Sequence, residues 1–60
     1  MDLWEYSGKN IRVEMDDGQV FEGKAYDYMS ADDNEPYPES ITIDSTELFV
    51  NEIKKITIVD

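Results

Sequence analysis

Five side chains with carboxylate or amide oxygens are close together in sequence near the middle of this 60-residue chain. They are Asp32, Asp33, Asn34, Glu35 and Glu39. Carboxylate and amide oxygens are the ligands that Ca²⁺ and Mg²⁺ prefer in proteins. The spacing does not fit an EF-hand, because the twelfth position counted from Asp32 is Ile43 and the sixth is not glycine. These acids therefore predict a solvated loop and no metal site, with a weak divalent site as the alternative.

The chain contains neither histidine nor cysteine. Their absence excludes disulfide bonds, the common zinc ligand sets and the nucleophile systems that depend on these two residue types. A chain this short also has little room for a deep pocket around paired carboxylates. We therefore predict no catalytic residue, no enzyme activity and no cofactor.

Three tyrosines near acids and prolines are candidates for binding a partner. Tyr26 and Tyr28 are two positions apart in a predicted strand and so are expected on one face, while Tyr37 lies between two prolines. Exposed aromatic side chains in such settings bind peptide segments of other proteins. The alternative is that Tyr26 and Tyr28 pack against a neighbouring strand or subunit and that Tyr37 stiffens its loop. The candidate partner-binding residues are Tyr26, Tyr28, Asp32, Asp33, Glu35, Tyr37 and Glu39.

The chain is strongly acidic, with 15 acids against five bases and a net charge of −10. Such a charge disfavours binding to nucleic acid or to anionic membranes, which depends on Lys and Arg. No apolar run approaches the roughly 20 residues of a membrane span, and the acidic N-terminal stretch is unlike a signal peptide. We therefore expect a cytoplasmic protein that binds no membrane. Charge alone also allows an acidic decoy that imitates nucleic acid.

The elements that must position these side chains are short strands. Alternating apolar and polar residues predict strands at residues 10–15, 19–28, 39–44, 48–50 and 53–59. Asp17-Gly18 is typical of a hairpin turn between the first two strands, and residues 30–38 read as a loop. The prediction is one all-β domain over residues 1–60, a small five-stranded bent antiparallel barrel.

Two features refine this barrel. The second strand has apolar residues on both faces and Gly23 in its middle, which predicts a strand that bends and serves two sheets. At the N-terminus, Asp2 and Glu5 match the spacing of a capping box, which predicts a short helical turn. We expect Leu3 and Trp4 to cover one end of the core. An N-terminal strand or a loosely ordered arm is the alternative.

Two stretches of the chain, taken together, combine glycines, acids and apolar strand residues in a motif-like order. The first combines Gly8-Lys9, a strand that ends at Asp17-Gly18, then Phe21-Glu22-Gly23 and Asp27. The second is Leu48-Phe49-Val50-Asn51-Glu52-Ile53, followed by Ile56-Thr57-Ile58. These stretches resemble the motifs of Sm-like proteins, and the whole chain, including Asp33-Asn34-Glu35-Pro36, is similar to very small Sm-like proteins of Gram-positive bacteria. Glycine-containing hairpins of this kind also open ordinary SH3-like barrels.

The resemblance implies a barrel whose fourth and fifth strands pair between subunits, in rings of six or seven that commonly bind uridine-rich RNA. The residues it implies at the subunit edges are Leu48, Phe49, Val50, Ile56, Thr57 and Ile58. Asp27 and Met29 correspond to members of the family's nucleotide pocket. The pocket's asparagine has no counterpart, because Ser30 or Ala31 falls there, and its Arg-Gly pair is replaced by Phe49 and Val50.

Charge also opposes RNA binding, because a ring of six such chains, each at −10, would carry about −60 and repel phosphate. We therefore predict a non-catalytic Sm-like interaction module that forms a homo-oligomer and contacts a protein partner. The alternative is an RNA-binding Sm-like ring with an atypical nucleotide pocket.

Overall fold

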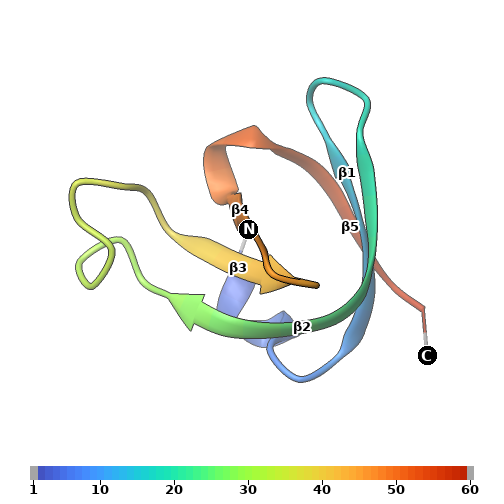
Figure 1. Ribbon diagram of the computed structural model, residues 1–60, viewed down its shortest axis with the longest axis horizontal. Helices are drawn as coiled ribbons and strands as arrows, with labels where there is room; N and C mark the ends of the chain where they lie inside the picture. Colours follow the sequence, from blue (N-terminus) through green and yellow to red (C-terminus); the bar gives the residue numbers. More distant parts are fainter. Residues whose placement is uncertain (1, 60) are drawn as a thin grey trace.

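The computed structural model describes residues 2–59 and contains five strands, every neighbouring pair of which is antiparallel. The strands are β1 (Asn10–Met15), β2 (Val20–Met29), β3 (Ser40–Ile43), β4 (Thr46–Phe49) and β5 (Ile53–Ile58). Two short 3₁₀ helices, η1 (Leu3–Tyr6) and η2 (Val50–Glu52), accompany them. The strand order is β4-β3-β2-β1-β5 in one strongly bent sheet (Figure 1). The prediction of a small all-β bent barrel with a short N-terminal helical turn is confirmed.

The longest strand, β2, bends and joins the two parts of the sheet (Figure 1). Its first half pairs with β1 and its second half pairs with β3. A Cβ atom on Gly23 would lie 3.0 Å from Cγ2 of Ile43 and 3.3 Å from a carboxylate oxygen of Asp44. Only glycine leaves this space open, so the β3–β4 turn can approach β2 closely. The predicted bend at Gly23 is confirmed.

A β-bulge interrupts β2 at Asp27. Asp27 has a positive φ of 50°, and the pairing with β3 shifts register between Tyr26 and Met29. A bulge inserts one extra residue and so changes which face the following side chains occupy. Tyr28 packs against the core, whereas Tyr26 is 40% exposed. The prediction that Tyr26 and Tyr28 share a face is therefore wrong.

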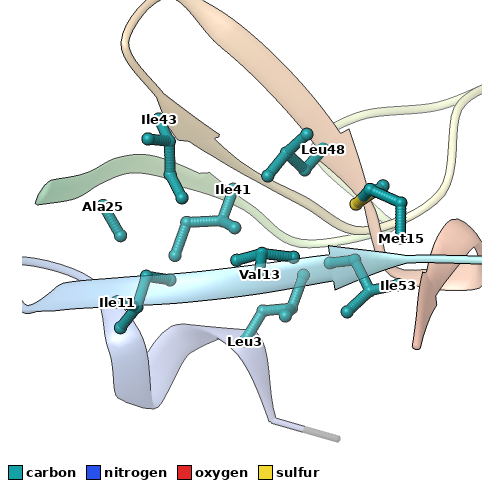
Figure 2. Packing of buried hydrophobic residues seen from close by; sticks show 9 residues of the cluster. All are labelled: Leu3, Ile11, Val13, Met15, Ala25, Ile41, Ile43, Leu48 and Ile53. Carbon is teal, nitrogen blue, oxygen red and sulfur yellow. The ribbon is translucent and has the colours of Figure 1, made fainter. Parts of the chain in front are cut away.

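The core is a single cluster of aliphatic side chains between the two parts of the sheet. Ile11, Val13 and Met15 enter it at every second position of β1, as predicted. In Figure 2, Leu3 from η1 and Ile41 from β3 approach Val13 from opposite sides. The buried members are Leu3, Ile11, Val13, Met15, Ala25, Ile41, Ile43, Leu48 and Ile53. Full burial of one such aliphatic side chain contributes about 1.5–3 kcal/mol.

The N-terminal turn differs from its prediction in two details. Leu3 is fully buried, but Trp4 is 60% exposed and does not cover the core. The capping box is also wrong, because no side-chain bond caps η1 and the N–H of Glu5 donates to the main-chain oxygen of Asp2 at 3.1 Å. In a single 3₁₀ turn, bonds between residues three apart satisfy the backbone donors directly.

The β3–β4 turn is shorter than predicted. Asp44 and Ser45 both have positive φ, at 48° and 69°. Two consecutive residues of this kind form the tight turn that suits a two-residue hairpin. Thr46 and Glu47, which the sequence places in the turn, therefore lie in β4.

The barrel is open along one side. Among residues 2–59, β4 and β5 are the two end strands of the sheet and do not pair with each other. η2 connects them over one end of the barrel. Its Val50 N–H donates to the main-chain oxygen of Glu39 at 2.9 Å, and the main-chain oxygen of its Glu52 accepts from the Asp16 N–H at 2.9 Å. Within residues 2–59, no helix has the length and apolar character needed to cross a membrane.

Candidate functional site

Charge is divided unevenly between two parts of the sheet. We call residues 25–52 the acidic half; it contains the second half of β2, the loop, β3, β4 and η2. We call residues 2–24 and 53–59 the mixed half; it contains η1, β1, the first half of β2 and β5. The mixed half carries all five bases, which are Lys9, Arg12, Lys24, Lys54 and Lys55. The acidic half carries no base and eight acids, which are Asp27, Asp32, Asp33, Glu35, Glu39, Asp44, Glu47 and Glu52.

A polar network fixes the long loop onto the acidic half. The Ser40 hydroxyl is fully buried and donates to Oε2 of Glu47 at 2.6 Å. The side-chain amide of Asn34 donates to the same oxygen at 3.2 Å and to the carbonyl of Pro38 at 2.8 Å. The two bonds to the Glu47 carboxylate are charge-assisted and hold the loop against β3 and β4. Sequence reasoning missed Ser40 and Glu47, because a serine and a glutamate in a strand do not by themselves signal a contact.

The first hollow of the molecule, which we call the hairpin groove, lies between the β1–β2 hairpin, β4 and η2. It has a volume of about 390 Å³. Met15, Phe21 and Leu48 provide its apolar part, and four carboxylates stand among its lining residues. The full lining is Met15, Asp16, Asp17, Gln19, Phe21, Thr46, Glu47, Leu48 and Glu52. An apolar surface beside several carboxylates suits a ligand that is both aliphatic and cationic.

The second hollow, which we call the outer hollow, lies beside the β3–β4 turn and the β2 bulge. Tyr26 stands opposite Thr42, which stands opposite Glu47, so these side chains form one row across three strands. The full lining is Tyr26, Asp27, Met29, Thr42, Ser45 and Glu47. The hollow thus brings together Asp27 and Met29, the two residues that the family resemblance relates to a nucleotide pocket. Its two carboxylates and no base would oppose a phosphate.

The three candidate tyrosines occupy different settings. The hydroxyl of Tyr26 accepts a hydrogen bond from the Ser45 N–H at 3.0 Å, which ties β2 to the β3–β4 turn. Tyr28 is half-buried and donates its hydroxyl to the carboxylate of Glu39. Tyr37 is 61% exposed, with its ring centroid 6.0 Å from that of Phe49. Of the three, Tyr37 offers the largest accessible surface for a partner.

Two pKa shifts follow from local hydrogen bonds. The bond that Tyr28 donates to Glu39, together with burial and the negative charge of that carboxylate, raises the pKa of Tyr28 to about 12. Hydrogen bonds from the backbone and side chain of Gln19 lower the pKa of Asp17 below its ordinary value. Asp17 is therefore ionised at neutral pH, and Tyr28 stays protonated well into the alkaline range.

The acids of the loop do not assemble into a metal site. Asp32, Asp33 and Glu35 are exposed, and Glu39 faces the hydroxyl of Tyr28. Among residues 2–59, no group of three or more candidate ligand side chains lies close enough together to hold a metal ion.

The predicted subunit-edge residues lie on the two end strands or in η2. Leu48 is 3% exposed, so its side chain belongs to the core of its own chain. Phe49, Val50 and Ile56 are half-buried, whereas Thr57 and Ile58 are exposed. Among the predicted edge residues, exposed side chains therefore lie on β5 and not on β4.

Comparison with known proteins does not assign a family. No protein-family model matches this chain, and neither the curated proteins nor the solved structures give a significant match. The resemblance to Sm-like proteins therefore stays a prediction.

Proposed function

We propose that this chain is a non-catalytic Sm-like interaction module that associates with copies of itself and contacts a protein partner. The observation that carries the proposal is the position of β4 and β5 at the two ends of the sheet, with no pairing between them among residues 2–59. The outer edge of an end strand offers backbone donors and acceptors that another strand can pair with. These are also the strands that pair between subunits in the family that the chain resembles.

The charges on the two end strands support a head-to-tail arrangement. The β4 strand carries Glu47, whereas β5 carries Lys54 and Lys55. A β5 edge placed against the β4 edge of a second copy would bring opposite charges together. Repulsion between the copies acts at longer range, and physiological salt screens it over a Debye length of about 8 Å.

Sedimentation at 0.15 M salt tests the assembly. We expect a species heavier than the 7.0 kDa chain. Lys54→Glu with Lys55→Glu should dissociate it, whereas Lys9→Glu with Lys24→Glu makes the same change in net charge away from β5 and should leave it assembled. A monomer at all concentrations would overturn self-association.

The acidic half supports contact with a protein partner. It presents eight acids, no base and the exposed ring of Tyr37. Such a surface complements a basic segment of another protein and repels nucleic acid. A cytoplasmic location fits this proposal, because a chain without cysteine does not depend on an oxidising compartment.

One observation favours a second candidate function, the binding of uridine-rich RNA by an atypical ring. Asp27 and Met29 line the same outer hollow. The absence of a base from the lining residues speaks against it, because cations supply most of the affinity for phosphate. Fluorescence anisotropy with a short oligouridine at physiological salt decides between the two. We expect weak or no binding, and a micromolar or tighter Kd would promote the second candidate.

A further inference from the structure

We propose that the hairpin groove binds an arginine-bearing segment of a partner protein, with the aliphatic part of the arginine on the apolar floor and the guanidinium among the rim carboxylates. The inference rests on the proposed contact with a protein partner and names the chemistry of that partner. Three of the lining residues, Thr46, Glu47 and Leu48, belong to β4, so a second copy paired along the outer edge of β4 would lie beside the groove and compete with the segment.

The floor of the groove is apolar. Met15 and Leu48 are 8% and 3% exposed and belong to the core, while Phe21 is half-buried beside them. The methylene groups of an arginine can cover such a surface while the charged end stays at the rim. Phe21 lines the groove, and an aromatic ring can bind a guanidinium, an interaction that arginine makes more often than lysine.

The rim is acidic and uncompensated. Asp16, Asp17, Glu47 and Glu52 line the groove, and among residues 2–59 no Lys or Arg lines it. The hydrogen bonds that Gln19 donates to Asp17 favour the ionised carboxylate. The planar guanidinium matches carboxylates that are arranged around one volume, because it donates in several directions.

Glu47 is positioned in advance by its own chain. Its Oε2 accepts from Ser40 and Asn34. Both bonds use Oε2 and fix the carboxylate on the outer face of β4, at the edge that the groove shares with the outer hollow. A carboxylate that is held this way loses little side-chain entropy when a cation binds.

The walls of the groove are also joined to each other. The Asp16 N–H donates to the main-chain oxygen of Glu52 at 2.9 Å, which fixes the hairpin tip against η2. The Val50 N–H donates to the main-chain oxygen of Glu39 at 2.9 Å, which fixes the other end of η2. The groove therefore exists before a ligand arrives.

Charge complementarity selects the occupant. A neutral apolar segment would partly dehydrate four carboxylates without pairing them, and a phosphate would be repelled. A cationic segment pairs the carboxylates and uses the floor at once. The volume of about 390 Å³ lies in the range of sites that hold small ligands or single side chains.

NMR titration of the full chain tests the proposal with a capped peptide in which two arginines are flanked by leucines. The control peptide carries citrulline in place of both arginines, which keeps the shape and removes the charge. We expect saturable shifts of the backbone amides of Asp16, Gln19 and Glu52 and of the Met15 and Leu48 methyl groups. The citrulline peptide should bind at least about tenfold more weakly, which corresponds to loss of a charge-assisted contact.

Matched variants separate the groove from net charge. Asp16→Asn with Glu52→Gln should weaken arginine-peptide binding about tenfold, whereas Asp32→Asn with Glu35→Gln removes two charges elsewhere and should weaken it less than about twofold. Equal affinity for the two peptides, equal loss in the two double variants, or shifts confined to the outer hollow would each overturn the inference. Failure of the proposed self-association is read separately, because sedimentation requires no peptide.

Discussion

The mixed half and the acidic half are both built from short antiparallel strands, but they differ in whether acidic residues have basic residues opposite them. In the mixed half, Arg12 stands opposite Glu22 and Glu14 stands opposite Lys55 in the strand registers. Cross-strand pairs of opposite charge stabilise a sheet. In the acidic half, Glu47 stands opposite Thr42, and no base is present in residues 25–52. The difference shows that acids have bases opposite them in the strand registers of the mixed half, whereas the acids of the acidic half have none.

The largest effect we predict is at Gly23, where the two halves approach each other. Gly23→Val should destabilise the fold by about 2–3 kcal/mol, because its side chain would collide with Ile43 and Asp44. Urea denaturation at a fixed protein concentration measures the change. Glu22→Val places the same side chain on the exposed neighbouring position and should cost less than about 1 kcal/mol. Equal midpoints for wild type and Gly23→Val would remove the argument for close approach.

The next effect concerns the network that organises the acidic half. Glu47→Ala should cost about 1–2 kcal/mol, because it leaves the buried hydroxyl of Ser40 without its acceptor. Glu47→Gln keeps an acceptor oxygen for Ser40 but removes the charge that strengthens the bond, so it should cost less than Glu47→Ala, about 0.5–1 kcal/mol. The same urea experiment compares the two variants. If both variants lose the same stability, the charge of Glu47 matters and its hydrogen bonds do not.

Tyr28 should make the stability of the fold depend on pH in the alkaline range. The folded pKa of Tyr28, about 12, lies above the ordinary value of 10.0, so the native state favours the protonated hydroxyl. This stabilisation is fully present below pH 10 and is lost as pH rises through about 12. Unfolding midpoints measured from pH 9 to 12 should fall less steeply for Tyr28→Phe than for wild type. Equal slopes for Tyr28→Phe and wild type would show that the bond from Tyr28 to Glu39 does not favour the protonated hydroxyl.

The smallest predicted effect is the change in folding stability when acids are neutralised, which should have opposite signs in the two halves. Asp32→Asn with Glu35→Gln should stabilise the fold by about 0.2–0.5 kcal/mol, because it relieves repulsion among acids that have no base nearby in sequence. Glu22→Gln should destabilise by about 0.2–0.5 kcal/mol, because Arg12 loses its cross-strand partner. Both effects should shrink in high salt, and the melting temperature of wild type should rise with salt. The same sign in both halves would mean that only net charge matters.

The strand pattern could be read from the sequence because its signals are local. The alternation of Ile11, Val13 and Met15 and the Asp17-Gly18 turn predicted the first hairpin. Gly23 predicted the bend, since glycine in a strand interior usually marks close approach. Each of these signals depends on residues that are close in sequence, and the structure contains the feature that each one predicted.

The errors arose where an irregular residue changed the count along a strand. The bulge at Asp27 moved Tyr28 to the core, and neither residue is a glycine that would have signalled it. Asp44 and Ser45 adopt positive φ without glycine, which hid the true start of β4. Trp4 could not be placed, because a single helical turn offers too few positions to reveal a buried face.

The candidate sites depended on contacts between distant segments, so the sequence predicted them least well. The hairpin groove needs Met15 and Phe21 beside Leu48 and Glu52, and only the fold brings these segments together. The separation of charge into two halves was readable from the sequence alone. The net charge of the whole chain does not show this separation, because net charge does not depend on the order of the residues.

The order of the strands has a consequence for how the molecule opens. Within residues 2–59, β2 is the only strand that pairs with a partner in each half, β1 on one side and β3 on the other. Separating the halves therefore requires β2 to lose half of its ladder and the shared core to be exposed. Amide hydrogen exchange in β2 should report global unfolding, whereas the outer amides of β4 and β5 should exchange through local fraying. Occupation of those outer edges would then appear as a selective slowing of exchange at the two ends of the sheet.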